Sequence, residues 1–249
     1  MTTNLRIVTT ARAIIIGAEI LSGKIKDTNS HSLAQTLRQL GIQLCSIETV
    51  GDSVGEIAEA VERAQRQADL VVTSGGIGPT HDDKTVEGVA RATGSEVELV
   101  PALVDLLQAH YGEKYGPAHA GMARAPAGAE LLTSQDHPWP IAVKNRIWMF
   151  PGVPELFRMK LLVLRRHVRG PSEFFHESLF LGVEETEIKD ALDAVATAYP
   201  GVEVGSYPKW FHPTHKTQIT FDGRSEEQVR QACAAFRQDL PAGWLARER

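Results

Sequence analysis

The sequence has little of what marks several large classes of protein. Its 249 residues include two cysteines, too few for a disulfide-based fold. Cys45 lies in a strand-like run and Cys233 on the apolar face of an expected helix, so we expect two buried thiols rather than a disulfide. No apolar run is long enough to span a bilayer, and no signal-peptide pattern opens the chain. We therefore expect a cytoplasmic protein with no membrane partner.

An excess of basic charge is also lacking, as are the common catalytic motifs. Lys and Arg number 26 against 31 Asp and Glu, and the net charge of −5 argues against a nucleic-acid partner. There is no Gly-Lys-Ser/Thr phosphate loop and no Gly-x-Ser-x-Gly motif. No His/Cys cluster has zinc spacing, and we expect the pair His212 and His215 to lie at the surface.

The hydrophobic residues, 43% of the chain, are arranged as in an α/β fold. Between residues 13 and 93, short apolar strands alternate with amphipathic helices, which is typical of a mostly parallel sheet in three α-β-α layers. Residues 146–150 read as the last strand of a first domain, 11–169. After a Gly-Pro-Ser linker the pattern restarts as β-α-β-β-α, which predicts a small α+β domain over 173–245.

The most informative segment runs from Leu70 to Thr85. Its apolar start predicts a buried strand, and the three glycines that follow can bring backbone N–H groups close to a phosphate. Asp82 and Asp83 would repel that phosphate, and a divalent cation between protein and phosphate oxygens is the usual remedy. The segment therefore predicts a phosphate site with Mg²⁺, Mn²⁺ or Co²⁺ held by Asp82 and Asp83. The expected ligand contacts here are Ser74, Gly75, Gly76, Gly78, Thr80 and Thr85.

Alternatives remain open within this segment. A glycine turn without a ligand is the simpler reading of the loop. The hydroxyls of Thr80 and Thr85 can donate to phosphate or cap the next helix. His81 is expected to be a solvated loop residue.

Three further loops follow expected strands, and carboxyl ends of parallel strands meet at one edge of a sheet. Glu19 and Asp27 in the first loop can hold a metal ion or a ligand hydroxyl, and Asn29 can read the ligand or cap a helix. Asp52 in the second loop is a metal ligand, a general base or the N-cap of the next helix. The other expected ligand contacts are Gly17, Pro151, Gly152 and Glu155.

Three motifs occur together in the first domain: Gly17-x-Glu-x-Leu-x-Gly23 with Asp27-Thr-Asn29, the run from Thr73 to Thr85, and Pro151-Gly-Val-Pro-x-Leu156. Together they resemble the molybdopterin-binding (MoaB/Mog-like) family. Within it they are most similar to the branch formed by the N-terminal part of CinA, the competence/damage-inducible protein, and the N-terminus of animal FAD synthase. The segment Gly205-Ser-Tyr-Pro208 and the tail around it resemble the KH-like second domain of CinA.

The resemblance implies a MoaB/Mog-like fold and a phosphorylated small molecule, either a pterin or an adenine nucleotide, as partner. In molybdenum-cofactor members, acids equivalent to Asp52 and Asp83 matter for pterin adenylylation with ATP and magnesium. The CinA and FAD synthase branch is associated with metal-dependent hydrolysis of ADP-ribose or FAD. We therefore predict a metal-dependent nucleotide pyrophosphatase with Asp52, Asp83 and Glu19 as its catalytic residues.

Two other functions stay open at this stage. One is a molybdopterin-binding or adenylylating protein of molybdenum cofactor biosynthesis, and the other is a non-catalytic module related to competence or DNA damage. The resemblance also implies a homo-oligomer, either a dimer or a trimer.

Overall fold

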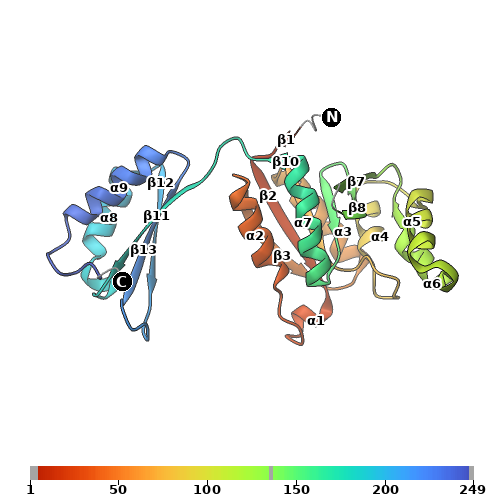
Figure 1. The fold of residues 1–249 in the computed structure, drawn as a ribbon, viewed down its shortest axis with the longest axis horizontal. Helices are drawn as coiled ribbons and strands as arrows, with labels where there is room; N and C mark the ends of the chain where they lie inside the picture. Colours follow the sequence, from red (N-terminus) through yellow and green to blue (C-terminus); the bar gives the residue numbers. More distant parts are fainter. Residues whose placement is uncertain (1–4, 135–136, 247–249) are drawn as a thin grey trace. The chain divides into compact units, whose positions relative to one another are not determined.

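The computed structural model describes residues 5–134 and 137–246. It divides into two compact units, Met1–Pro171 and Ser172–Arg249 (Figure 1). Each unit has a sheet and a hydrophobic core of its own.

The first unit is built on a six-stranded sheet in the order β3-β2-β4-β9-β8-β7. The first four of these strands are parallel, and β8 and β7 continue the sheet as an antiparallel hairpin. Every residue of β4 is buried, because this central strand is covered on both faces of the sheet. The sheet strands are β2 (Thr10–Ile16), β3 (Gln43–Val50), β4 (Leu70–Ser74), β7 (Glu130–Ser134), β8 (His137–Lys144) and β9 (Ile147–Phe150).

Helices cover both faces of this sheet and make the fold three-layered (Figure 1). α2 and α7 pack on one face around Leu33, Phe157 and Phe150. α3 and α4 pack on the other around Ile57 and Val89. The predicted three-layer, mostly parallel α/β fold is confirmed. The helices are α1 (Ala18–Leu21), α2 (Asn29–Gln39), α3 (Val54–Gln67), α4 (Thr85–Ala92) and α7 (Pro154–His167).

An excursion between α4 and β7 forms a small layer with its own apolar cluster around Leu103, Leu107 and Ala123. Its two strands, β5 and β6, pair with each other antiparallel. Its elements are β5 (Val97–Leu99), α5 (Pro101–Tyr111), η1 (Gly112–Lys114), α6 (Pro117–Ala120), η2 (Gly121–Ala123) and β6 (Arg124–Pro126). A short parallel pair, β1 (Arg6–Ile7) and β10 (Val168–Arg169), lies apart from the main sheet.

The second unit is a three-stranded antiparallel sheet in the order β11-β13-β12, with α8 and α9 packed on it around Phe221 and Phe236. Trp210 and Phe211, in the turn between β12 and β13, are 84% and 100% exposed. The elements are β11 (Phe175–Leu181), η3 (Glu185–Glu187), α8 (Lys189–Ala198), β12 (Val202–Pro208), β13 (Thr217–Gly223) and α9 (Glu226–Gln238).

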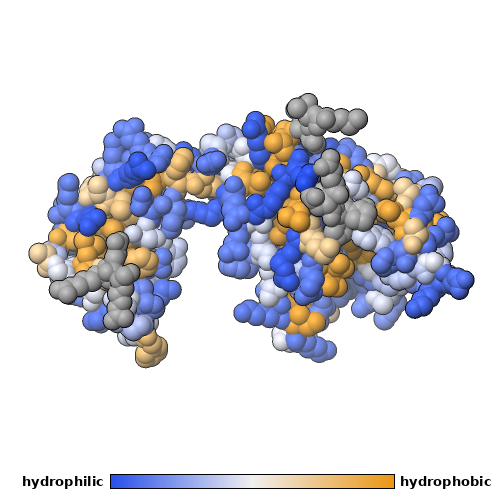
Figure 2. Space-filling model, viewed as in Figure 1, coloured by the Kyte–Doolittle hydropathy of each residue, from blue (hydrophilic) through white to orange (hydrophobic). Residues whose placement is uncertain are grey.

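The surface of the first unit carries hydrophobic side chains along α7. Leu156, Met159 and Leu162 recur on its outer side and are 44%, 40% and 48% exposed. Figure 2 shows hydrophobic residues scattered among hydrophilic ones where α7 lies. A search for a helix able to cross a bilayer finds none in the described ranges of the chain.

The prediction of two buried thiols is wrong for Cys45, which is exposed. It lies on β3, the edge strand of the sheet, and alternate side chains of that strand point away from the core. Cys233 is half-buried, and burial raises the pKa of its thiol. Both thiols are free in this structure.

The first unit has a buried cation, Lys160, on α7. Lys160 on α7 donates from Nζ to the carbonyl oxygens of Trp139 and Pro140, at 2.5 and 2.6 Å. Desolvation lowers the pKa of this ammonium to about 8. These carbonyl groups are the polar partners that make its burial possible.

The lowered pKa of Lys160 makes stability depend on pH. The folded protein releases this proton near pH 8, whereas the unfolded chain holds it to about pH 10.5. Between these values the unfolded state binds more protons than the folded state. The free energy of unfolding therefore increases as the pH rises. We expect the free energy of unfolding of wild type, relative to that of Lys160→Met, to rise by about 2 kcal/mol from pH 7 to pH 10. Urea denaturation at each pH makes the measurement. Parallel pH profiles would contradict it.

Candidate functional site

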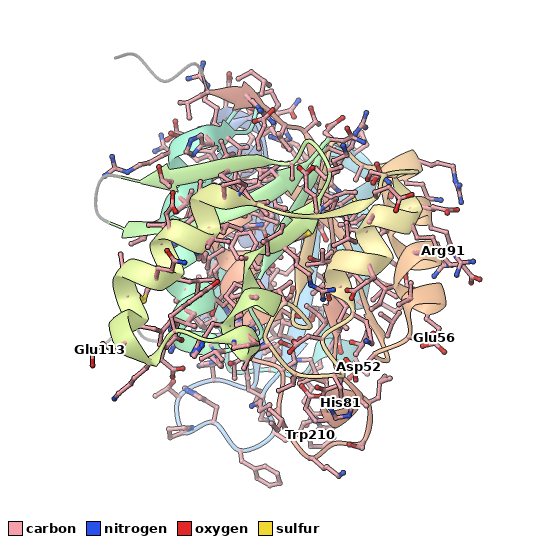
Figure 3. All side chains as sticks on the ribbon, turned by 90° about the vertical axis from the view of Figure 1, so that its right-hand side faces the viewer. Asp52, Glu56, His81, Arg91, Glu113 and Trp210 are labelled. Atoms are coloured by element: carbon pink, nitrogen blue, oxygen red, sulfur yellow. The ribbon has the colours of Figure 1, made fainter. Side chains whose placement is uncertain are left out.

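The carboxyl ends of β2, β3, β4 and β9 lie along one edge of the first sheet, because these strands are parallel neighbours. The four predicted loops follow these strands, so the chain brings them to that edge. In Figure 3, Asp52 and His81 are labelled toward the same end of the first unit. His81 is exposed, as expected.

Gly75 makes the sharp turn at the end of β4. It has a φ of +103°, and a Cβ there would lie 2.3 Å from the carbonyl oxygen of Ile16. Its N–H donates to the carbonyl oxygen of Phe150 at 3.1 Å. The prediction that Gly75 helps to cradle a phosphate is therefore wrong for its N–H group, since β9 already uses that donor. Only glycine fits here, because the neighbouring strand β2 runs directly against it.

The next three residues leave their N–H groups available. Gly76 has a φ of +64°, and within the described residues no acceptor is found for the N–H of Gly76, Ile77 or Gly78. These residues are half-buried, so the donors lie near the surface of the loop. Successive N–H groups around a left-handed residue form an anion-binding concavity. Among the described residues, the donors left for the predicted cradle are therefore those of residues 76–78.

Asp83 lies across this cradle. Its Oδ2 accepts from the N–H of Thr80 at 2.8 Å and from the Thr80 hydroxyl at 2.6 Å. A Cβ at Gly78 would lie 2.7 Å from the same oxygen, so the carboxylate folds directly over that glycine. The Thr80 hydroxyl is thus used inside the loop, and Asp83 Oδ1 has no partner among the described residues.

Asp82 is different, because its side chain is exposed. The pKa of its carboxyl is lowered, first by the Thr80 side chain and to a smaller extent by its own backbone N–H, His81 and Lys84. It therefore stays charged well into the acidic range. The loop presents one fixed carboxylate, Asp83, and one solvated carboxylate, Asp82.

Thr85 does not face the ligand. It is fully buried, and its hydroxyl donates to the carbonyl oxygen of Gly75 at 2.7 Å. Both predicted roles, phosphate donor and helix cap, are therefore wrong, because the hydroxyl is consumed in holding the glycine turn. A Cβ at Gly76 would lie 2.5 Å from the same hydroxyl oxygen.

The loop after β2 contributes Gly17 and Glu19. Glu19 is exposed on α1, and its carboxylate folds back so that a Cβ at Gly17 would lie 2.5 Å from Oε1. Asp52, after β3, accepts from the N–H of Ala18 through Oδ2 at 2.9 Å. It makes no cap for α3, whose N-cap is Ser53, so that alternative is wrong. Asp52 ties the first two loops together at the rim.

Asp27 and Asn29 are used structurally in α2. Asp27 accepts from the N–H groups of Asn29 and Ser30 and from the Ser30 hydroxyl, and so satisfies free N–H groups in the first turn of this helix, whose N-cap residue is Thr28. The prediction that Asn29 itself is the cap is therefore wrong. Asn29 is 6% exposed, and Ser74, which it contacts, is 2% exposed. Both side chains are buried, and their contact with a ligand stays a prediction.

The loop after β9 lies against the glycine turn. A Cβ at Gly152 would lie 3.2 Å from the Cα of Gly75, and the Gly152 carbonyl accepts from Asn29. Pro151 is half-buried beside it. Glu155 is exposed and pairs with Arg158 at 3.4 Å along the surface of α7. Glu155 therefore has a partner on its own helix, and its contact with a ligand stays a prediction.

The residues present fit a cation that arrives with a phosphate. Among residues 5–134 and 137–246 no group of three or more His, Cys, Asp or Glu is placed to hold a metal ion. Mg²⁺ commonly takes only one or two protein carboxylates and completes its shell with phosphate oxygens and water. Asp83 Oδ1 and the Asp82 carboxylate are donors of that kind, beside unpaired N–H groups suited to phosphate.

Sequence reasoning missed two groups here. The N–H of Ile77 has no acceptor among the described residues and lies between those of Gly76 and Gly78, although an isoleucine gives no signal of such a role. The Gly152 carbonyl anchors Asn29, and no local pattern predicts that contact. Both are backbone groups, whose partners depend on the fold and not on the side chain at that position.

Comparison with known proteins follows the two units. The model of a probable molybdopterin binding domain matches residues 12–167. The chain belongs to the molybdopterin-binding domain family. The model of the middle domain of FAD synthase matches residues 173–249. The family resemblance inferred from the motifs is thereby confirmed, and it indicates a domain for a phosphorylated small molecule such as a pterin or a nucleotide.

Individual relatives agree with these matches. A protein of Archaeoglobus fulgidus is 34% identical over 228 residues, 91% of this chain and 96% of its own. A probable FAD synthase of Caenorhabditis elegans is 27% identical over 95% of this chain. A CinA-like protein of Myxococcus xanthus is 30% identical over 88% of this chain. The chain spans about half the length of these last two relatives, 50% and 55% respectively.

A solved structure supports the fold of this family member. The crystal structure of CinA from Thermoplasma acidophilum superposes with a TM-score of 0.58 and 30% identity. It covers 64% of this chain and 96% of that chain. The likeness therefore concerns about two thirds of this chain.

Proposed function

We propose that the first unit is a metal-dependent pyrophosphatase for a nucleotide pyrophosphate of the ADP-ribose or FAD class. The observation that carries the proposal is the set of unpaired N–H groups at Gly76, Ile77 and Gly78 directly beside Asp83. Anion donors and a carboxylate occupy the same few residues, and a phosphate with its cation reconciles them. The similarity of 95% of this chain to a probable FAD synthase, together with the match of residues 173–249 to the middle domain of FAD synthase, supports a nucleotide as the ligand.

The chain's own groups then divide the work of hydrolysis. The N–H groups of residues 76–78 bind the oxygens of one phosphate and fix the pyrophosphate at the loop. Asp52 uses Oδ2 to accept from Ala18, so Oδ1 is the oxygen that can accept a proton. The oxygen of an attacking water forms a bond to one phosphorus, the bridging P–O bond breaks, and the water proton passes to Asp52. ADP-ribose would give AMP and ribose 5-phosphate, and FAD would give AMP and FMN.

Two further acids complete the proposed site. Asp82 and Asp83 would hold Mg²⁺, Mn²⁺ or Co²⁺, which when bound polarises a phosphoryl oxygen and lowers the pKa of water. Glu19, exposed on α1, is the alternative to Asp52 as the group that orients the water.

The direct test is product formation by the whole chain. We expect AMP to accumulate when the purified protein is incubated with ADP-ribose or FAD and each of the three cations, and to stop with a chelator. Chromatographic quantification of AMP makes the measurement, with Asp83→Asn as background. AMP that never exceeds this background would eliminate the enzymatic function.

A second candidate is a molybdopterin-binding protein, favoured by the description of the family that matches residues 12–167. The same cradle would bind the pterin's phosphate, with no hydrolysis of ADP-ribose or FAD. Pterin fluorescence that copurifies with the protein, or adenylylation of a pterin with ATP, would support it against the pyrophosphatase.

A further inference from the structure

The side chain of Asn29 joins three separate loops of the candidate site. From the first residue of α2, its Nδ2 donates to the Gly152 carbonyl at 2.8 Å and to the Ser74 hydroxyl at 3.0 Å. The Ser74 hydroxyl lies 3.5 Å from the carbonyl oxygen of Pro151. One buried amide therefore links the start of α2, the end of β4 and the turn after β9.

The direction of this amide follows from its partners. The Gly152 carbonyl can only accept a hydrogen bond, so the nitrogen of Asn29 must face it. Asn29 Oδ1 is left buried and without a partner among the described residues. An unpaired buried acceptor is unfavourable, so the oxygen of the amide does not stabilise this position. The two hydrogen bonds donated by Nδ2 are therefore the reason that an amide suits it.

The turn after β9, which Asn29 anchors, also contacts the glycine loop after β4. Gly152 lies so close to Gly75 that a Cβ on Gly152 would be 3.2 Å from the Gly75 Cα. The N–H of Gly75 donates to Phe150, immediately before the same turn. Displacing the turn would therefore displace Gly75 and the unpaired N–H groups that follow it.

We propose that Asn29 is a positioning residue that holds the anion-binding loop 76–78 through its two amide donors, without touching the ligand. The proposal rests on the proposed function for the ligand that the loop binds. A carboxylate at position 29 would be isosteric but would face the Gly152 carbonyl with an acceptor. A space-filling role and a donor role therefore make opposite predictions for Asn29→Asp.

The experiment compares Asn29→Asp, Asn29→Ala and Asn145→Asp in the full chain. Asn145 is exposed in the turn between β8 and β9, before the amino end of β9, so its variant makes the same chemical change away from the site. Hydrogen exchange of peptides covering 72–80 and 150–154 reports the loop, and calorimetry with ADP-ribose and Mg²⁺ reports binding. Circular dichroism checks that each variant folds.

We expect the amide hydrogens of these two peptides to exchange faster in both variants at Asn29. We also expect both variants to bind ADP-ribose with an affinity at least about tenfold lower than that of wild type. Asn145→Asp should match wild type in both measurements. The proposal is overturned if Asn29→Asp also matches wild type, or if only Asn29→Ala loosens the loop, because volume and not the donors would then matter. If wild type binds no ADP-ribose, the proposed function fails, and the exchange rates still decide the role of Asn29.

Discussion

Gly75→Ala is expected to lower the free energy of unfolding of the first unit by about 3 kcal/mol or more and to abolish ligand binding. Two effects add at this position. A side chain is strained at a φ of +103°, and the new Cβ would lie 2.3 Å from the Ile16 carbonyl oxygen. Relief requires β2 and β4 to separate or the glycine loop to move, and each movement displaces the cradle at 76–78. Urea denaturation and calorimetry with ADP-ribose measure the two losses.

Gly94→Ala is the matched control for Gly75→Ala. Gly94 has a φ of +61°, but nothing lies within 4 Å of a Cβ built there. This variant isolates the backbone strain, which we expect to cost about 1 kcal/mol with no change in binding. Equal losses for the two variants would show that the close approach of Ile16 to Gly75 has no effect on stability.

Asp83→Asn is expected to reduce the hydrolysis of ADP-ribose by about a hundredfold while changing stability little. The amide oxygen of an asparagine can still accept from the N–H and the hydroxyl of Thr80, so the turn keeps its shape. The variant removes the negative charge that the proposed cation requires. Initial rates of AMP formation at several concentrations of Mg²⁺ make the measurement.

Thr80→Val serves as the counterpart of Asp83→Asn. It removes the hydroxyl that lies 2.6 Å from Asp83 Oδ2, yet leaves the charge and the N–H donor in place. We expect a loss of rate of only about fivefold, since one neutral donor is missing. A Thr80→Val rate as low as that of Asp83→Asn would mean that the shape of the turn, and not the charge of Asp83, governs activity.

The order of strands and helices in the first unit could be predicted from the local sequence pattern. Short apolar strands such as Leu70–Ser74 alternate with helices whose apolar residues recur every three or four positions, and this order permits few topologies. Because carboxyl ends of parallel strands share an edge, the four loops of the site could also be brought together in advance. The glycines and acids of residues 75–83 indicated a phosphate with a cation, and this chemistry stays a prediction.

The assignment of individual groups within the site was not accessible in this way. Cys45 is exposed because β3 lies at the edge of the sheet, and the order of strands is a property of the whole fold. Thr85 was expected to donate to phosphate or cap a helix, yet its hydroxyl is buried against Gly75. In both cases the residue type was compatible with several environments, and the packing of distant segments selected one.

Residue order alone therefore determined the layered sheet, the edge that carries the loops and the presence of phosphate-compatible backbone beside paired acids. Tertiary structure decided which polar groups remain unused: the carbonyl of Phe150 accepts from the N–H of Gly75, the N–H of Ala18 donates to one oxygen of Asp52, and the carbonyl of Gly152 accepts from the amide nitrogen of Asn29. The reason is that each polar group bonds to whichever complementary group the fold brings within about 3 Å, and these partners lie 34 to 123 positions away along the chain. If calorimetry gave equal nucleotide affinity with and without a chelator, the proposal that a cation joins the acids to the phosphate would be wrong.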